Sequence, residues 1–363
     1  MTCPTRTRPI HVPGTAPRQI LRRILRRATA TATSTALVVS ALAASAALSP
    51  EGPGAPEYEL AGKRTARVPV RVATFNVHNN TPYDQARAAV RRLLPYADVI
   101  GLQEFENPSR TPIVAALSDE GWRYWKPYGG DPVIYDGDKF SFLSAEAVEI
   151  SQASTVEDPK SQYAPKEVRN SYATVVRLWH AAAGQRVTVV NVHLIARATQ
   201  DGRPAREAPT RVSVYKQEMR AVAALVAKEK TAATVYAVGD WNIHYNFDVR
   251  ERVYAFPFRQ FKRQGFESVW KTKRPQRPTI NDKGVIDGVW STTAPARARV
   301  LAGFPESDHR PVRVKYRLAV TGAAAPAGSG RSTDDPAEQD EREAEEEPTT
   351  EGSGSGCLLG LLC

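Results

Sequence analysis

The stretch of this 363-residue chain best suited to chemistry is an apolar run that ends in a carboxylate and a carboxamide, between Val235 and Asn242. Its length predicts a buried strand, and a strand end is a rigid place from which to present polar side chains. Asp240 can accept a proton or bind a cation, and Asn242 offers both a donor and an acceptor. A backbone that stays extended through Trp241 would place both side chains on one face. A plain strand-to-turn junction would use Gly239, Asp240 and Asn242 equally well.

Polar residues occur where other apolar runs begin or end. Asn76, Glu104 and His193 each lie near the end of such a run, Asp287 lies within a fourth, and His309 precedes the last. An unpaired buried carboxylate is costly, so we expect Asp287 to pair with a histidine. If these strands lie side by side, the polar groups meet at one edge of two packed sheets.

The same residues form a chemically coherent set. Glu104 and Asp308, with Asn76 nearby, are hard oxygen ligands that suit Mg²⁺, with Mn²⁺ or Ca²⁺ as alternatives. Asp287 would hold His309 in one tautomer and stabilise its cation.

Three further residues complete this chemistry. Asp240 could orient or deprotonate a water molecule. Asn242 and His193 could bond phosphoryl oxygens as negative charge builds up in the transition state. Together these groups could act at a phosphoryl group.

Strands and hairpins must bring these groups together. Apolar periodicity predicts helices at 83–94, 111–120 and 209–228. Strands are predicted at 68–78, 97–104, 132–135, 139–150, 172–179, 186–194, 235–240, 285–291, 297–301 and 312–318. Polar loops are expected at 151–169 and 195–209, and a mostly loop-like segment is expected around Phe256, Phe258 and Phe261. The close succession of strands between 132 and 194 favours antiparallel hairpins.

The two ends of the chain differ in charge from its middle. Residues 1–46 carry seven Arg and no acid, and their paired arginines precede an Ala-rich stretch, which predicts a twin-arginine-like or Sec export signal and a secreted or cell-envelope protein. Residues 47–66 are expected to be a linker, and residues 321–363 an acidic disordered tail. Between 47 and 325, 40 Lys and Arg face 29 Asp and Glu, a basic balance that suits an anionic partner. We expect a monomer without a stable membrane span.

A second basic feature follows the Asp240 stretch. Aromatic residues, Phe261 and Trp270, are interleaved with the basic residues Arg259, Lys262, Arg263, Lys271, Lys273, Arg274 and Arg277. Such a segment could follow a phosphate backbone. A solvated basic loop would explain the same composition.

The order of these motifs resembles the endonuclease/exonuclease/phosphatase superfamily, which includes deoxyribonuclease I and exonuclease III. The resemblance covers residues 68–319 and rests on Asn76, Gln103-Glu104, Asn191-Val192-His193-Leu194, Gly239-Asp240-Trp241-Asn242, Ile286-Asp287 and Ser307-Asp308-His309. It implies that residues 67–320 form a four-layer α/β sandwich, with helices outside two packed, mostly antiparallel sheets. It also implies metal-dependent cleavage of phosphate esters.

The resemblance further implies residue roles. Asn76, Glu104 and Asp308 would bind the metal, Asp240 would position the attacking water, and His309 with Asp287 would be the buried pair. His193 and Asn242 would hold the phosphate, and Asn170 would add a substrate contact. No residue is assigned to support His193, because Gly129, Gly130 and Asp131 occupy the corresponding region.

The leading hypothesis is a secreted phosphodiesterase that hydrolyses DNA or RNA by in-line attack of water. The first alternative is a sphingomyelinase-like phospholipase, or a phosphatase acting on inositol phosphates or other small molecules, at the same site. The second is a catalytically inactive extracellular binding module, which would be expected to have lost part of the site.

Overall fold

The computed structural model of this protein describes residues 66–158, 165–281 and 283–325, which belong to one compact unit, Gly62–Cys363. The predicted export signal and nearly all of the predicted linker and acidic tail lie outside the described residues. None of the helices in the described part is both long and apolar enough to cross a membrane.

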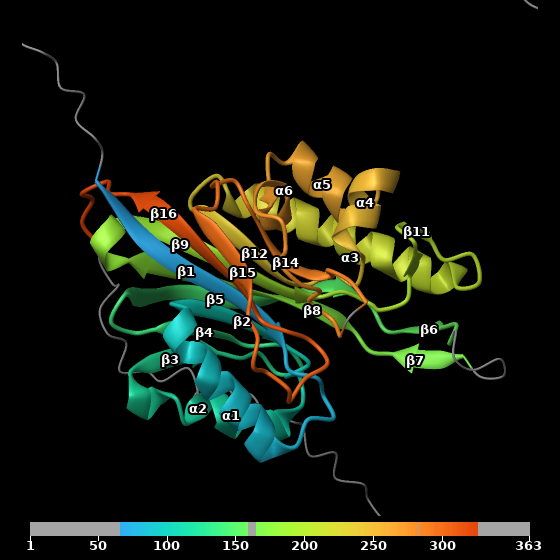
Figure 1. Cartoon of the computed structure of the whole chain (residues 1–363), viewed down its shortest axis with the longest axis horizontal. Helices are drawn as coiled ribbons and strands as arrows, with labels where there is room; N and C mark the ends of the chain where they lie inside the picture. Colours follow the sequence, from blue (N-terminus) through green and yellow to red (C-terminus); the bar gives the residue numbers. More distant parts are fainter. Residues whose placement is uncertain (1–65, 159–164, 282, 326–363) are drawn as a thin grey trace, which may run out of the picture. The chain divides into compact units, whose positions relative to one another are not determined.

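Two six-stranded sheets form the centre of the described unit (Figure 1). The strands of the first sheet are β1 (Arg67–Asn76), β2 (Val99–Gln103), β3 (Trp122–Trp125), β4 (Val133–Asp136), β15 (Arg297–Val300) and β16 (Val312–Ala319). Those of the second are β5 (Phe140–Ser151), β8 (Ser171–His180), β9 (Gln185–His193), β12 (Thr234–Asp240), β13 (Glu267–Ser268) and β14 (Asp287–Ser291).

The two sheets have the same pairing pattern. The strand order is β15-β16-β1-β2-β4-β3 in the first sheet and β13-β14-β12-β9-β8-β5 in the second. In each sheet the two central strands, β1 with β2 and β12 with β9, pair in parallel. The neighbouring pairs on either side are antiparallel. The prediction of mostly antiparallel sheets is therefore confirmed.

Helices cover both outer faces of the sheets, and this completes four layers (Figure 1). On one side lie α1 (Tyr83–Leu93) and α2 (Thr111–Ala115). On the other side lie α3 (Pro209–Glu229), α4 (Tyr245–Glu251), α5 (Pro257–Arg263) and α6 (Val269–Thr272). Short 3-10 helices occur at Leu94–Tyr96, Pro108–Arg110, Ser118–Glu120 and Ala181–Ala183.

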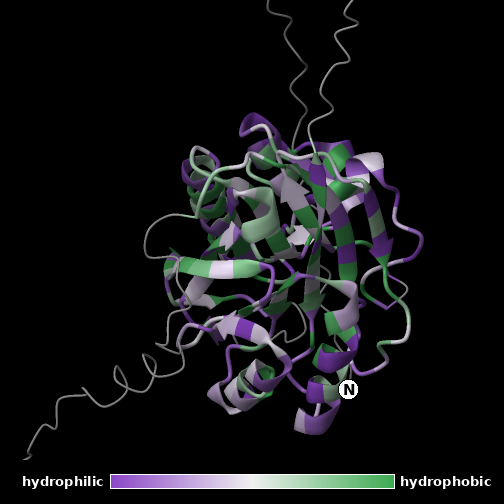
Figure 2. Ribbon diagram, turned by 90° about the vertical axis from the view of Figure 1, so that its left-hand side faces the viewer, coloured by the Kyte–Doolittle hydropathy of each residue, from purple (hydrophilic) through white to green (hydrophobic). Residues whose placement is uncertain are grey.

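Alternating apolar side chains explain why the layers stack. In β1, Val70 and Val72 pack between the sheets, whereas Phe75 packs against the helices on the other face. β12 divides in the same way, with Val238 between the sheets and Ala237 toward α3. A strand buried on both faces must be apolar along its whole length. Figure 2 shows hydrophobic residues concentrated in the strands, with hydrophilic residues more frequent on the outer helices.

The segment expected to be mostly loop contains α4, α5 and α6, so that expectation was wrong. Each of these helices has only one or two turns, which is too short to give a clear 3.6-residue repeat. The aromatic residues of this segment lie in the core, since Phe256, Phe261 and Trp270 are buried. The two predicted polar loops also contain small hairpins, β6 (Ser154–Val156) with β7 (Lys166–Val168) and β10 (Thr199–Gln200) with β11 (Arg203–Pro204).

Candidate active site

The site lies where the central strands of the two sheets end. β1 and β2 run in parallel, so Asn76 and the residue after Gln103 reach the same edge. In the second sheet Asp240 is the register partner of both His193 and Asp287. The expected convergence of strand ends is thus present, and it draws on both sheets.

Asn76 connects the two sheets. Its side-chain N–H groups donate to Glu104 Oε1 at 2.9 Å and to Asp240 Oδ2 at 3.2 Å. The other Glu104 oxygen accepts from the backbone N–H of Asn79 at 2.6 Å. Glu104 has a positive φ of 60°, a left-handed conformation that a non-glycine residue keeps only where its surroundings enforce it.

Arg110, which the sequence did not single out, enforces that conformation. This buried guanidinium donates to the carbonyl oxygens of Glu104, His78, Asn79 and Thr81 at 2.8–3.1 Å. It therefore joins the turn after β1 to the turn after β2. A buried arginine that bonds only backbone leaves no sequence signal, because its partners are carbonyl groups that every residue carries.

Asp131 provides a second support that was left unassigned. This buried carboxylate precedes β4 and accepts from the backbone N–H of Phe105 at 2.7 Å, directly after Glu104. Burial and the charge of Glu106 raise the pKa of Asp131 to about 7. Its charge in turn favours the cation of His193. A carboxylate at the start of an apolar strand was the available signal.

A tight turn, rather than an extended backbone, joins Asp240 to Asn242. β12 ends at Asp240, Asn242 has a φ of 49°, and its backbone N–H donates to Asp240 Oδ1 at 2.9 Å. The Asn242 side chain donates to the carbonyl oxygen of Leu194 at 2.7 Å, which brings it beside His193. This is the strand-to-turn junction that the sequence also allowed, and the Asp240 side chain closes the turn. A side chain at Gly239 would collide with the β9 backbone, since a Cβ there would lie 2.1 Å from the carbonyl oxygen of Val192.

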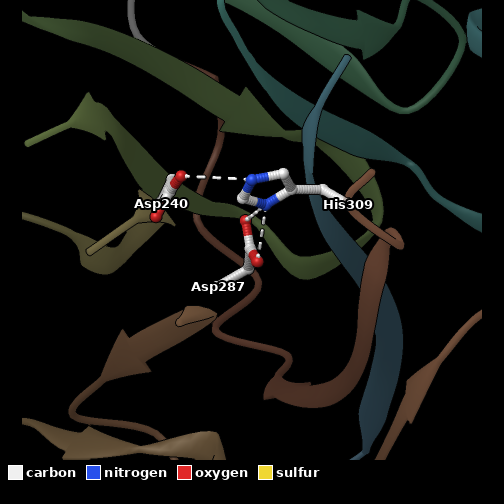
Figure 3. A group of neighbouring side chains, drawn as sticks. All are labelled: Asp240, Asp287 and His309. Atoms are coloured by element: carbon white, nitrogen blue, oxygen red, sulfur yellow. Dashed lines mark hydrogen bonds and ion pairs between the residues drawn. The ribbon is translucent and has the colours of Figure 1, made fainter. Parts of the chain in front are cut away.

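His309 binds both buried aspartates (Figure 3). Its Nδ1 lies 3.0 Å from each oxygen of Asp287, and its Nε2 lies 3.7 Å from Asp240 Oδ2. Ser307 sets the turn before it, accepting from the His309 backbone N–H at 3.0 Å and donating to the Asn76 carbonyl oxygen at 2.8 Å. The predicted pair of Asp287 and His309 is therefore present in the structure.

The electrostatics of the site follow from burial and close charges. Burial and the charge of Asp287 raise the pKa of Asp240. Burial opposes the cations of His193 and His309, but the neighbouring aspartates outweigh it and raise both pKa values. Neighbouring groups also outweigh burial at Glu104, where His193 and the Asn76 amide stabilise the carboxylate and lower its pKa. Asp240 is thus a buried carboxylate shared by two imidazoles, with His193 Nε2 also 3.7 Å from its Oδ2.

The residues predicted to bind metal fit a hard divalent cation. Asp308 Oδ1 is buried and has no hydrogen-bond partner among the described residues, and it lies 4.0 Å from His309 Nε2. Glu104 keeps lone pairs beyond the two hydrogen bonds that it accepts. A set of carboxylate and amide oxygens is what Mg²⁺ prefers. Asp240, Asp287 and His309 also offer ligand atoms within 4.8 Å of one another, but the close contact between Asp287 and His309 occupies that imidazole nitrogen.

Asn170 is a predicted site residue whose side-chain partners lie outside the group described above. It immediately precedes β8, beside the strand that ends at His193, so it lies at the same edge of the sheet. Its side chain donates to Glu149 at 2.8 Å and accepts from the backbone N–H of Ala153 at 2.8 Å. In the described residues, Asn170 therefore holds a surface turn.

Comparisons with known proteins identify the family of this chain. Residues 73–309 match the model of the Endonuclease/Exonuclease/phosphatase family, whereas no curated protein matches the chain. A solved structure of a protein of that family from Bacteroides thetaiotaomicron is 16% identical, with a TM-score of 0.50 over 70% of this chain and 99% of its own. D. rerio TDP2 complexed with a single-strand DNA product is 16% identical, with a TM-score of 0.48 over 68% of this chain and 98% of its own. A mannosyl-6-phosphatase of B. thetaiotaomicron is 15% identical, with a TM-score of 0.49 over 68% of this chain and 99% of its own. Since the family model spans well over half of the sequence, this chain belongs to the endonuclease/exonuclease/phosphatase family.

Proposed function

We propose that this protein is a metal-dependent phosphodiesterase that hydrolyses nucleic acid. One observation carries the proposal: Asp240 contacts Asn76 from the first sheet and lies 3.7 Å from both His193 and His309. A carboxylate held between two imidazoles and beside a set of oxygen ligands is suited to activating water next to a phosphate. The basic balance of residues 47–325 favours a polyanionic substrate.

Each side chain then has a defined task. Asp240 orients the attacking water and accepts its proton, while Asn76 holds that carboxylate in place. His193 and Asn242 bond the phosphoryl oxygens, and Asp287 fixes His309 so that its Nε2 points toward Asp240. A cation held by Asn76, Glu104 and Asp308 would neutralise charge on the phosphate.

The direct test is digestion of plasmid DNA and of RNA with Mg²⁺, Mn²⁺ or Ca²⁺, and again with EDTA. We expect cleavage with Mg²⁺ and none with EDTA, whatever the polymer. Failure to cut either polymer would contradict the nuclease proposal. Release of phosphocholine from sphingomyelin, or of phosphate from inositol or sugar phosphates, would then assign the site to the alternative substrates.

An inactive binding module is disfavoured because the main predicted positions all carry groups able to do chemistry. Turnover of none of these substrates under any metal would support that alternative instead. We also propose export of the protein, on the basis of the arginine pairs and the Ala-rich stretch before residue 47. Recovery of the full-length chain only inside the producing cells would contradict export.

A further inference from the structure

A basic hollow of about 380 Å³ opens beside the candidate active site. Its volume falls within the roughly 300–1,000 Å³ typical of sites for small ligands. We call it the side hollow, and its lining residues that matter here are His244, Phe247, Arg277, Pro278, Lys283 and Gly284.

The walls of the side hollow are direct continuations of the site. The backbone N–H of Tyr245 donates to the carbonyl oxygen of Val285 at 2.9 Å, two residues before Asp287. In the chain between the lining residues Pro278 and Lys283, the backbone N–H of Asn281 donates to the carbonyl oxygen of Asp308 at 2.7 Å. A ligand in the side hollow would therefore lie next to a phosphate held at Asp240.

The charge of the side hollow suits an anion. Arg277 and Lys283 are exposed, and neither forms an ion pair with another described residue. No carboxylate is among its described lining residues. Unpaired cations around a concave surface attract phosphate groups and hold them as charged hydrogen-bond acceptors.

An aromatic pair lines the same surface. The rings of His244 and Phe247 stack with centroids 5.1 Å apart and an interplanar angle of 30°. Gly284 permits this arrangement, because a Cβ there would lie 1.7 Å from His244 Cε1. A flat ring beside unpaired cations is the combination by which proteins bind the base and the phosphate of single-stranded nucleic acid.

We propose that the side hollow binds the nucleotide adjacent to the scissile phosphate of a nucleic-acid strand. Arg277 and Lys283 hold its phosphate, and its base packs against the half-buried His244–Phe247 pair, in which Arg250 already lies over the Phe247 ring, 4.8 Å from its centroid. The inference rests on the proposed function and narrows it, because a substrate with one phosphate and no base would leave the side hollow empty. Of the basic segment noted in the sequence, Arg277 then contacts substrate, whereas Phe261 and Trp270 are core residues.

The test is binding of a fluorescently labelled thymidylate 12-mer by anisotropy in EDTA, across a salt series. The double variant Arg277→Gln/Lys283→Gln should weaken binding about tenfold at 0.1 M salt. Its slope of log K against log salt should fall in magnitude by about 1.4, as expected for loss of two phosphate contacts on a single strand. The charge-matched control is Arg186→Gln/Arg317→Gln.

The control removes the same charge at the opposite end of the sheets. Arg186 is the second residue of β9, which reaches the site only at His193, and Arg317 is paired with Pro69 near the start of β1. An equal loss of affinity and slope in both double variants would mean that only net charge matters, and would overturn the proposal. We call Arg277→Gln/Lys283→Gln the side-hollow variant. If its slope of log K against log salt equals that of the wild type, the proposal is overturned as well.

Competition identifies the group that is bound. Thymidine monophosphate should displace the 12-mer at lower concentration than inorganic phosphate or phosphocholine does, and that advantage should disappear in the side-hollow variant. Equal displacement by all three would show an anion site without nucleotide recognition, contrary to the proposal.

Activity separates this inference from the proposed function. With Mg²⁺, the ratio of oligonucleotide cleavage to hydrolysis of bis(4-nitrophenyl) phosphate should fall about tenfold in the side-hollow variant and stay unchanged in the control. If the wild type hydrolyses neither substrate, the proposed function is wrong, and the binding experiment still tests whether the side hollow binds a nucleotide. If the wild type hydrolyses both substrates and the ratio is the same in the side-hollow variant, the nucleotide-binding proposal is wrong while the proposed function stands.

Discussion

The two sheets share one pairing pattern but hold their site residues by different means. In the second sheet, Asp240, His193 and Asp287 are register partners in the β-ladder, so backbone hydrogen bonds fix their spacing. In the first sheet, Glu104 lies beyond the strand end in a left-handed turn. There Arg110, from outside the sheet, clamps the backbone.

This difference matches the chemical role of the residues that each sheet positions. Buried charges that repel or attract each other strongly, such as Asp240 and Asp287, need fixed separations, which a ladder provides. The oxygen ligands of a cation must instead keep lone pairs free for it, as Glu104 and Asp308 do in turns outside the strands. We therefore expect substitutions in the second sheet to affect turnover most, and those in the first sheet to affect metal affinity and local stability.

The largest effect should follow Asp240→Asn. Loss of the carboxylate removes the group that orients and deprotonates water, so kcat should fall by about 10³-fold or more. The melting temperature should stay the same or rise, because burial already disfavours the Asp240 charge. Steady-state kinetics on the 12-mer and thermal unfolding would measure the two effects.

A matched control for Asp240 is another buried aspartate far from the site. Asp98 precedes β2 at its opposite end and is paired with Arg71 and Lys139 at 2.6–2.7 Å. Asp98→Asn should lower stability and leave kcat nearly unchanged. Equal loss of kcat in both variants would contradict the role given to Asp240.

Arg110→Gln tests whether the Arg110 guanidinium holds the turns after β1 and β2 together. This change leaves several buried carbonyl oxygens without a donor, and we expect the free energy of unfolding to fall by about 3 kcal/mol. Arg123 provides the control because it also donates to backbone carbonyls, of Ser118 and Trp122, but at the surface. Arg123→Gln should cost less than about 0.5 kcal/mol, and a similar loss in both variants by urea unfolding would refute the clamp.

The metal ligands of the first sheet are tested by Glu104→Gln. A neutral ligand binds a divalent cation more weakly, so the Mg²⁺ concentration for half-maximal activity should rise about tenfold, with a loss of kcat of about 10²-fold that high Mg²⁺ partly restores. Mn²⁺ binding followed by electron paramagnetic resonance should weaken in parallel, without any substrate present. An unchanged metal titration would remove Glu104 from the ligand set.

Much of this arrangement could be predicted from the sequence because strand ends leave a local signal. Apolar runs ending in Asn76, Glu104, His193 and Asp240 gave the strands and the site together, and the fold inferred from the family resemblance is confirmed. The sequence does not show which residues of the central strands face the other sheet and which face the helices. Both faces of these strands are apolar, so apolar and polar residues do not alternate along them.

The missed features depend on contacts distant in the sequence. Arg110 bonds the backbone of residues 78–81, and nothing in those residues indicates a partner. The short helices α5 and α6 are stabilised by burial of Phe261 and Trp270 rather than by their own periodicity. Tertiary contacts of this kind override local propensity.

The smallest expected effect concerns a carboxylate beneath the second sheet. Glu218 on α3 is buried and accepts from the backbone N–H of Ile195 at 2.8 Å, just after His193, and burial raises its pKa from 4.5 to about 7. The unfolded chain therefore releases this proton first as the pH rises. The stability that protonated Glu218 contributes is complete below pH 4.5 and is lost as the pH rises toward 7. Glu218→Gln should flatten the fall in unfolding free energy over that range.

On the same helix, the pKa of Glu229 is shifted in the opposite direction: burial opposes its charge, but Arg177 at 2.6 Å outweighs burial and lowers the pKa. The stability that ionised Glu229 contributes is present above pH 4.5 and is lost in acid. Glu229→Gln should therefore change only the acidic part of the curve of unfolding free energy against pH. Urea unfolding of both variants between pH 3 and pH 8 would separate the two limbs. Equal changes on the same limb would show that α3 supports the second sheet by packing alone.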